Sequence, residues 1–441
     1  MKKSTLRLGC GAGFSGDRFE PAEILVERGN LDVLVLECLA ERTIALAQKR
    51  KLQNPADGYD PYLVRRLERL LPLLHRHQVQ LVTNMGAANP LAAGEKTLEL
   101  ARKANLPLRI AVVSGDDVIS NLDLNTLCLE TGTPLQALGE IVSANAYLGI
   151  EALLPAMASD ADVIITGRVA DPSLFLAPMI HYFQWDQSDY AKLGQGTVIG
   201  HLLECAGHLT GGYFADPLKK PVADMAFLGH PLAEIHADGQ AILTKPPHTG
   251  GLLNVQTAKE QLLYEVINPH AYLTPDVTAD FTQVELIQSG ENRVLLRGGR
   301  GKMRPETLKV SVGYKAGYMG EGEIAYAGPG ALARAQWAGE IVKLRLQKFI
   351  PELNIDLLGY NAIHRRQFMP TSEPTEVRLR VAGMAPDAFT AQLVGEDVEA
   401  LYTNGPAGGG GARKLVTEVI GIASILMPRE AVKPQLHILE S

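Results

Sequence analysis

Residues 6–37, LRLGCGAGFSGDRFEPAEILVERGNLDVLVLE, decide the fold of this chain. The apolar run at 6–8 predicts a short strand. The four glycines at positions 9, 11, 13 and 16 predict a tight loop before a helix over 19–30. A second apolar strand follows over 31–37. A strand, a glycine loop, a helix and another buried strand are typical of a parallel α/β unit.

The same alternation continues along the chain. It predicts helices over 61–77, 91–104 and near 134–158, and strands over 80–84, 109–115 and 161–167. Short apolar runs between amphipathic helices indicate a parallel sheet covered on both faces. From about residue 218 alternating segments separated by glycine turns take over, interrupted by predicted helices over 257–268 and 330–348. We therefore expect an α/β fold, with an N-terminal parallel sheet flanked by helices in residues 1–217 and a smaller mixed α+β domain in residues 218–441.

Polar residues follow the predicted strands. Ligands of open α/β sheets bind beyond the carboxyl ends of the strands. The positions expected to face one cleft are Asp17, Glu37, Asn84, Asn89, Asp116, Arg168 and Asp171. Each also has a structural alternative: Asp116 could cap a helix, Asn89 before Pro90 suits a turn, and Arg168 could be a surface charge.

The glycine loop resembles a dinucleotide fingerprint. Gly11, Gly13 and Gly16 match the spacing GxGxxG, and Glu37 stands where an acidic residue would bind a ribose. Gly11, Gly13, Asp17 and Glu37 are therefore candidate ligand-binding residues. The alternative is a tight turn between strand and helix that binds no nucleotide.

Residues 194–217, GQGTVIGHLLECAGHLTGGYFADP, place polar side chains in an otherwise apolar helix. His201, Glu204, Cys205 and His208 recur at helical spacing and predict one polar face. Glu204 and His201 are the candidate catalytic pair, with Arg168 as a third catalytic residue. The zinc motif HExxH is absent, and a buried cysteine on a helix is commonly a packing residue. We predict no bound metal and no cofactor.

Two places in the second half favour ligand binding. Lys245 follows a predicted strand, where it could meet a carboxylate or a phosphate; the alternative is an exposed strand-end lysine. Residues 402–414, YTNGPAGGGGARK, place Asn404, Gly408 and Gly409 ahead of a helix predicted to begin near Ala412, a geometry that suits anions. Leu415 follows Lys414, so the run is not a nucleotide-binding P-loop.

Composition narrows the class of protein. The net charge of −7 argues against nucleic-acid binding, which needs clustered Lys and Arg. The four cysteines form no CxxC pair, which fits a reducing cytoplasm. The N-terminus lacks an apolar run of signal-peptide length, and no stretch is long and apolar enough to suggest a membrane span. We expect a cytoplasmic protein whose partners are small molecules and further copies of itself, and not membranes.

Several of these blocks carry a resemblance that covers about residues 5–430. They are GCGAGFSGDR, VTNMGAANP, GHLLECAGHLTGGYFADP, LYEVINPHAYLTPDVTADF, GYMGEGEIAYAGPGA and LYTNGPAGGGGARK. With them the chain resembles the acyclic terpene utilisation (AtuA) family. The resemblance implies a setting in the bacterial breakdown of branched acids carried as coenzyme A thioesters. Glu204 and His201 keep the family pattern, which has Gln where this chain has His208.

The sequence leaves three classes of function open. The leading hypothesis is a lyase or hydratase acting on a small branched hydroxy acid or its coenzyme A thioester, in which Glu204 and His201 exchange protons. A hydrolase would use the same residues to activate water. The third is a non-catalytic accessory subunit of an acyl-CoA-processing complex, which would not need so many polar residues at strand ends.

Overall fold

The computed structural model describes residues 4–364 and 372–441. The chain divides into two compact units, each described by itself. The first unit comprises Met1–Gln136, Val142–Gly313 and Ile422–Ser441, and the second comprises Ala137–Ile141 and Tyr314–Gly421. The boundary expected between residues 217 and 218 lies inside the first unit.

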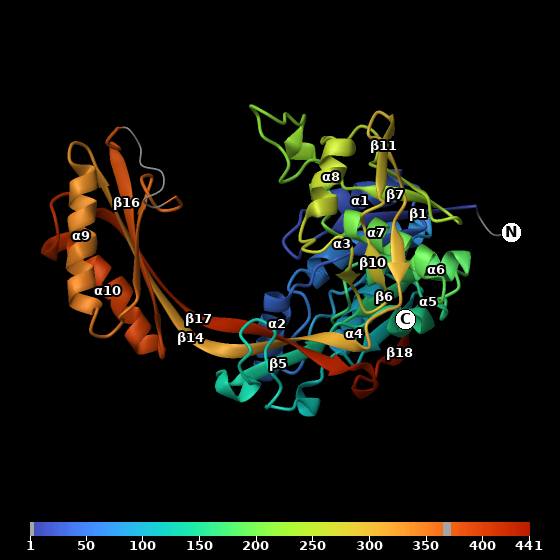
Figure 1. Ribbon diagram of the computed structural model, residues 1–441, viewed down its shortest axis with the longest axis horizontal. Helices are drawn as coiled ribbons and strands as arrows, with labels where there is room; N and C mark the ends of the chain where they lie inside the picture. The colour runs from blue at the N-terminus through green and yellow to red at the C-terminus, as the bar shows by residue number, and fades with distance from the viewer. Residues whose placement is uncertain (1–3, 365–371) are drawn as a thin grey trace. The chain divides into compact units, whose positions relative to one another are not determined.

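A mixed sheet organises the first unit, with strand order β11-β12-β8-β7-β1-β2-β3-β6-β4-β18 (Figure 1). Its central strands β1 (Thr5–Ala12), β2 (Val33–Leu36), β3 (Gln80–Thr83), β6 (Val163–Thr166) and β4 (Arg109–Ser114) pair in parallel. The edges are antiparallel: β7 (Leu232–His236), β8 (Ala241–Thr244), β12 (Arg293–Arg297) and β11 (Glu285–Gly290) on one side, β18 (Gln435–Glu440) on the other. The mixed α/β class predicted from the sequence is confirmed.

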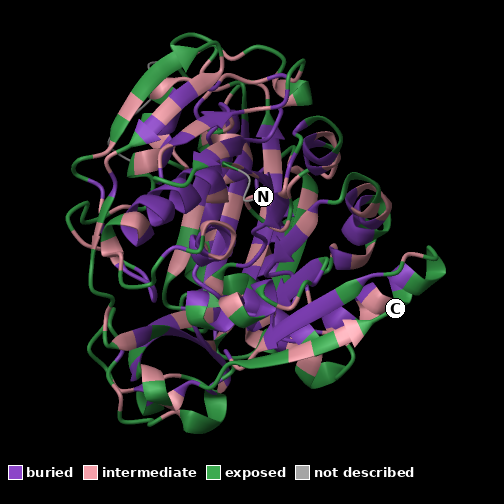
Figure 2. Ribbon diagram, turned by 90° about the vertical axis from the view of Figure 1, so that its right-hand side faces the viewer, coloured by how far each residue is buried: buried purple, intermediate pink, exposed green. Residues whose placement is uncertain are grey.

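Helices cover this sheet. They are α1 (Glu20–Arg28), α2 (Glu41–Gln53), α3 (Leu63–His77), α4 (Pro90–Lys103), α5 (Ile150–Met157), α6 (Ser173–Phe183), α7 (Tyr190–Glu204) and α8 (Val255–Leu263). Leu25 of α1 and Leu67 of α3 belong to the same buried core as Leu34 and Leu36 of β2. All four residues of β2 are buried, which requires cover on both of its faces. Figure 2 shows the buried residues gathered in the strands and the helices beside them.

A small sheet lies beside α7. It consists of β9 (Tyr272–Leu273), β10 (Thr278–Asp280) and β13 (Arg300–Lys302), in the order β13-β10-β9. Helix α7 contacts both β13 and β10. This packing places aromatic residues of the small sheet next to the polar end of α7.

The second unit combines four strands with two helices. The strands are β14 (Thr307–Ala327), β15 (Leu353–Leu358), β16 (Glu376–Ala385) and β17 (Gly410–Pro428), in the order β15-β16-β14-β17. Helices α9 (Ala331–Leu346) and α10 (Ala388–Asn404) pack on β16 through a core that includes Val342, Leu379 and Val394. β14 and β17 both continue into the first unit.

Two sequence predictions of helices are wrong. The segment near 134–158 contains a short 3-10 turn (Leu135–Ala137) and then a strand, β5 (Ile141–Ala146), which pairs with β14; α5 is its only α-helix among the described residues. The glycine run does not open a helix near Ala412, because residues 410–428 form β17 beside β14. Both errors concern segments whose backbone partners lie far away in the sequence. Among the described residues, no helix has both the length and the hydropathy that a membrane crossing requires.

Candidate functional site

Polar side chains follow neighbouring strands of the sheet, as the sequence predicted. Glu37 follows β2, Asn84 follows β3, Arg168 follows β6 and Asp116 follows β4. Because these strands are parallel and adjacent, their carboxyl ends share one edge of the sheet. The structure therefore brings these four residues to one place.

Glu37 and Asn84 form a fully buried link between β2 and β3. Nδ2 of Asn84 donates to Oε1 of Glu37 at 2.9 Å, and its Oδ1 accepts from the N–H of Cys38 at 2.7 Å. Glu37 also accepts from the N–H of Leu39 at 2.9 Å. Burial, and then the nearby carboxyl of Asp171, raise the pKa of Glu37 well above its usual range. The pair fixes the chain that leads from β2 to Leu39.

Arg168 is the buried cation of the site, with 2% of its surface exposed. Its Nη1 donates to the carbonyl of Leu39. Its Nη2 lies 3.3 Å from Oδ1 of Asp171, and its guanidinium lies 4.0 Å from the ring centroid of Tyr147. Burial disfavours the charge, but Asp171, Tyr147 and Glu41 outweigh it and raise the pKa of Arg168. The guanidinium stays charged, and its Nε has no hydrogen-bond partner among the described residues.

Asp116 holds the backbone of Arg168. Its Oδ2 accepts from the N–H of Arg168 at 2.9 Å and from Nδ2 of Asn145 at 2.8 Å. Burial raises the pKa of Asp116 to about 6, against the effect of these hydrogen bonds. Asp116 thus acts on the site through Arg168.

Glu41 is the ionised partner of this cation. Its Oε1 accepts from the hydroxyl of Tyr147 and from Nζ of Lys309, the latter at 3.2 Å. Burial alone would raise the pKa of Glu41, but Arg168 and the Tyr147 hydroxyl lower it to about 2. The sequence analysis did not single out Glu41, Tyr147 or Lys309. Tyr147 follows the strand β5 that was predicted as helix, so no strand-end signal marked it.

Asp171 differs from Glu41 although both face Arg168. Its side chain is 33% exposed, and its Oδ1 has no hydrogen-bond partner among the described residues. Desolvation raises the pKa of Asp171 to about 7, opposed by Arg168 and reinforced by Glu204 and Glu41. This carboxyl changes its charge near neutral pH and is accessible to solvent.

His201 and Glu204 form the pair that their spacing predicted. Nδ1 of His201 lies 2.8 Å from Oε1 of Glu204, and the two side chains are 1% and 12% exposed. Burial raises the pKa of Glu204, against the effect of His201. Burial lowers the pKa of His201, but Glu204 outweighs it and the pKa is raised. Both groups therefore favour their protonated forms relative to the same groups in water.

One outer atom of this pair is unsatisfied. Within the described part of the chain, Oε2 of Glu204 has no hydrogen-bond partner. The imidazole of His201 differs, because the backbone of Leu262 and Gln261 lies close to it and also raises its pKa. The rings of Tyr272 and Phe281 lie 5.5 Å and 5.4 Å from the ring of His201. An aromatic wall thus borders the imidazole and limits its access to water.

The predicted four-residue polar face is wrong in its second half. Helix α7 ends at Glu204, Cys205 caps it, and His208 lies in a separate short turn. Ala206 has φ of 42°, a left-handed conformation that ends the α-helix. His208 instead contacts the rings of Tyr213 and Tyr264 at 5.6 Å and 5.1 Å.

The glycine loop after β1 packs against the end of α7. A Cβ on Gly13 would lie 2.5 Å from the carbonyl carbon of Cys205 and 2.7 Å from the carbonyl oxygen of Glu204. A Cβ on Gly11 would lie 2.8 Å from Cβ of Ala22 in α1. Asp17 accepts from the N–H of Gly13 at 2.7 Å. Close packing explains both glycines without a nucleotide.

The remaining candidates lie outside this cluster. Asn89 caps α4 and donates to the carbonyls of Pro55 and Asp57 at 2.9 Å and 2.7 Å, so its bonds are those of a turn residue. Nζ of Lys245 donates to the carbonyl of Thr249 at 2.7 Å within a local turn. Asn404, Gly408 and Gly409 belong to the second unit.

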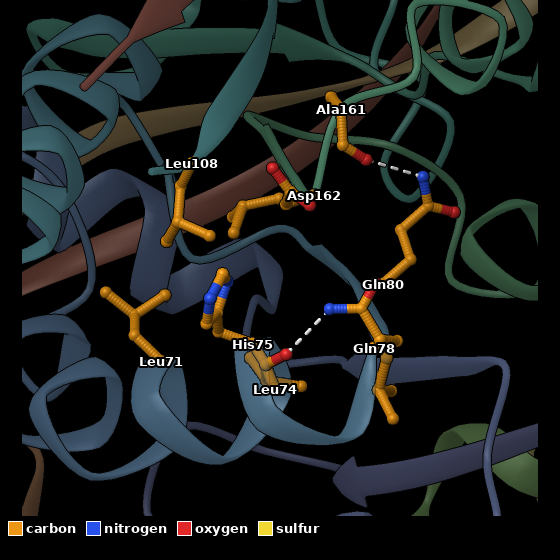
Figure 3. A pocket seen from close by; sticks show the side chains of 10 residues that line it. Leu71, Leu74, His75, Gln78, Gln80, Leu108, Ala161 and Asp162 are labelled. Carbon is orange, nitrogen blue, oxygen red and sulfur yellow. Dashed lines mark hydrogen bonds between the residues drawn. The ribbon is translucent and has the colours of Figure 1, made fainter. Parts of the chain in front are cut away.

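A surface hollow lies at the other end of the sheet (Figure 3). It has a volume of about 110 Å³ and is lined by residues at the amino-terminal ends of β3, β4 and β6, including Gln80, Leu108 and Val163. Nε2 of Gln80 donates there to the carbonyl of Ala161 at 2.7 Å. This hollow does not include the charged residues that follow the strands, so we do not assign the site to it.

No His, Cys, Asp or Glu side chains in residues 4–364 and 372–441 form a group of three or more that could hold a metal ion. Burial, followed by the charge of Glu204, raises the pKa of the Cys205 thiol, which opposes the thiolate that a metal needs. The prediction that no zinc is bound stays a prediction.

Among the comparisons with known proteins, one gives a match. No curated protein and no solved structure matches the chain. A family model described as "Acyclic terpene utilisation family protein AtuA" matches residues 6–438, which is nearly the whole chain. The protein thus belongs to the acyclic terpene utilisation (AtuA) family, a family associated with the use of acyclic terpenes.

Proposed function

We propose that the protein is an enzyme of terpene catabolism whose proton-transfer pair is Glu204 and His201. The observation that carries the proposal is a buried atom, Oε2 of Glu204, that has no hydrogen-bond partner among the described residues while Oε1 of the same carboxyl lies 2.8 Å from Nδ1 of His201. Leaving a buried polar atom unpaired costs about 1–3 kcal/mol. A group that is bonded on one side and free on the other is suited to exchange a proton with a bound molecule.

Charged residues nearby supply the other requirements of such chemistry. Arg168 is a permanent cation with a free Nε, suited to bind a carboxylate or the carbonyl oxygen of a thioester. Asp171, with a pKa of about 7, provides a second carboxyl that changes protonation near neutrality. Pairs of titratable groups whose pKa values are shifted are typical of acid–base sites.

The reaction class that fits best is that of a lyase or hydratase, acting on a small branched hydroxy acid or its coenzyme A thioester. In a lyase step, Glu204 removes the hydroxyl proton, the adjacent carbon–carbon bond breaks to leave a carbonyl, and the carbanion at the other carbon takes a proton. In a hydratase step, Glu204 takes a proton from water as its oxygen adds to the double bond, and the neighbouring carbon is protonated. Both steps need one base, one acid and a cation beside the acyl oxygen.

The membership in a family of acyclic terpene utilisation supports branched substrates, because these are the carbon skeletons that terpenes provide. A hydrolase of a similar substrate remains the alternative enzyme, since the same pair could activate water. An accessory subunit of an acyl-CoA-processing complex is the non-catalytic alternative. Against it stands the unpaired Oε2 of Glu204, which a scaffold does not require.

Solvent-deuterium exchange tests the proposal. The full chain is incubated in D₂O with branched hydroxy acids, the corresponding unsaturated acids and the coenzyme A thioesters of both, and deuterium at the carbon next to the carboxyl group is followed by NMR. Exchange or bond cleavage that disappears in Glu204→Gln supports the enzyme. Release of free coenzyme A without exchange would favour the hydrolase, and inactivity on every substrate would favour the accessory subunit.

A further inference from the structure

Two glycine turns meet in the second unit. One is Gly328-Pro329-Gly330, between β14 and α9, and the other is the run Gly408–Gly411, whose last two residues begin β17. Arg334 in the first turns of α9 joins them. Its Nη1 donates to the carbonyl of Ala407 at 2.7 Å, and its Nη2 donates to the carbonyl of Ala327 at 2.7 Å.

The positive charge of Arg334 is not neutralised by a carboxylate. Its recorded partners are backbone carbonyls, and among the residues that the structure describes none of the ion pairs includes Arg334. Other cations of the unit differ, since Arg345 binds Asp397 and Lys414 binds Glu399. A partly exposed cation without a counter-charge attracts anions.

The beginning of α9 adds backbone donors to this charge. Gly330 caps the helix without a side-chain hydrogen bond, and the first turn contains no acidic residue. The N–H of Ala331 already donates to the carbonyl of Gly328 at 3.1 Å, but the next N–H groups of the first turn have no partner within the helix, and the helix dipole favours negative charge there. A Cβ on Gly328, Gly330, Gly410 or Gly411 would meet nothing within 4 Å, so space is open beside both turns.

A buried hydroxyl points to a ligand independently of the helix. Tyr326 is 1% exposed, and its Oη has no hydrogen-bond partner among the described residues. A Cβ on Gly409 would lie 3.2 Å from this Oη, so the hydroxyl faces the glycine run. The guanidinium of Arg334 lies 5.9 Å from the centre of the tyrosine ring. The backbone of Gly409 lies close to the hydroxyl, and a run of glycines has the conformational freedom to move.

From these contacts we propose that the two glycine turns, Arg334 and Tyr326 form a binding site for a phosphate group. Phosphate matches a cation, helix N–H groups and a hydroxyl donor, because its oxygens accept several hydrogen bonds and carry negative charge. The group could belong to a nucleotide carrier or be free phosphate. The site lies within the second unit and does not depend on the proton-transfer pair of the first unit.

Calorimetric titration of the full chain tests this site. The probes are inorganic phosphate, pyrophosphate and adenosine 3′,5′-bisphosphate, with sodium chloride as the ionic-strength control. Tyr326→Phe removes only the hydroxyl and is expected to fold, because deleting an unpaired buried polar atom is near neutral or stabilising. Losing a hydrogen bond to a charged group should weaken binding about tenfold or more. Arg334→Gln should weaken it by at least as much.

Matched variants control for general effects. Arg345→Gln removes the same charge from the same helix, and Tyr318→Phe removes a hydroxyl from the same strand; neither should change binding. Preference for adenosine 3′,5′-bisphosphate identifies a nucleotide carrier, and equal binding of pyrophosphate identifies free phosphates. The proposal is overturned if no probe binds, or if Tyr326→Phe binds as tightly as the unaltered chain. Should Arg334→Gln fail to fold, the result for Tyr326→Phe decides.

Discussion

Replacing Glu204 by Gln tests the proton-transfer pair most directly. The carboxyl of Glu204 lies 2.8 Å from Nδ1 of His201, and the two side chains are 12% and 1% exposed. Glutamine keeps the shape and one hydrogen bond but removes the charge. The substitution therefore separates the chemistry of this position from its packing.

The expected loss of stability depends on pH. A hydrogen bond to a charged group contributes about 1.5–3 kcal/mol, so the loss at about pH 6 should be at most of this size. Because Glu204 raises the pKa of His201, the contribution of the charged pair is present only between the pKa of Glu204 and that of His201, and it is lost as the pH rises through the latter. The pKa of Glu204 is also raised, so its ionised form is costly at high pH. The loss should shrink or reverse at about pH 9.

Three measurements check this expectation. Urea unfolding at both pH values gives the change in free energy, and NMR titration of His201 should show a lower pKa in Glu204→Gln. With a substrate in hand, turnover should fall by about 10²- to 10⁴-fold, the usual contribution of an acid–base group. Glu260→Gln is the matched control, because Glu260 pairs with Lys220 at the surface and both side chains are 40% exposed. Such a pair contributes about 0–1 kcal/mol.

An unchanged pKa of His201 in Glu204→Gln would refute the electrostatic coupling. Turnover near that of the unaltered enzyme would remove Glu204 from the mechanism and leave His201 as the candidate base. Equal losses of stability in Glu204→Gln and Glu260→Gln would show that the burial of the His201–Glu204 pair adds nothing to the free energy of unfolding.

Three further predictions concern packing, pH and metal content. Gly13→Ala should lower the free energy of unfolding in urea by about 1–3 kcal/mol, because its Cβ would lie 2.5 Å from Cys205; Gly410→Ala, with open space at that position, is the control, and equal stability of the two variants would contradict the packing. The pKa of Asp171 is raised to about 7, so its contribution to stability should fall as the pH rises between about 4 and about 7, less steeply than the full shift implies because the side chain is 33% exposed. Asp171→Asn should flatten this part of the urea-midpoint profile, and an unaltered profile would exclude Asp171 as its source. Elemental analysis should find no stoichiometric zinc, whereas about one zinc per chain, lost in Cys205→Ser, would reverse the assignment of Cys205 as a packing residue.

The sequence by itself determined the local elements and the pairing of His201 with Glu204. The spacing of apolar residues located β2, β3, β4 and β6 and the helices α1, α3 and α4, because periodicity reflects contacts within a few residues. His201 and Glu204 are three residues apart on α7, so the helix alone places them side by side. Arg168 was predicted to follow a strand because it comes just after the apolar run that forms β6.

Only the tertiary structure decided what surrounds these residues. Glu41, Tyr147 and Lys309 reach one another from α2, the end of β5 and β14, and no sequence spacing relates them. The glycine run continues as β17 and not as a helix, because β14 supplies the hydrogen-bond partners of a strand. Helix α7 ends where its last residues meet the backbone of Gly13. Strand pairing, burial and the resulting pKa shifts arise between residues that are distant in the chain. A local pattern does not contain that information, and this is why the sequence predicted the contact between His201 and Glu204 but not its electrostatic environment.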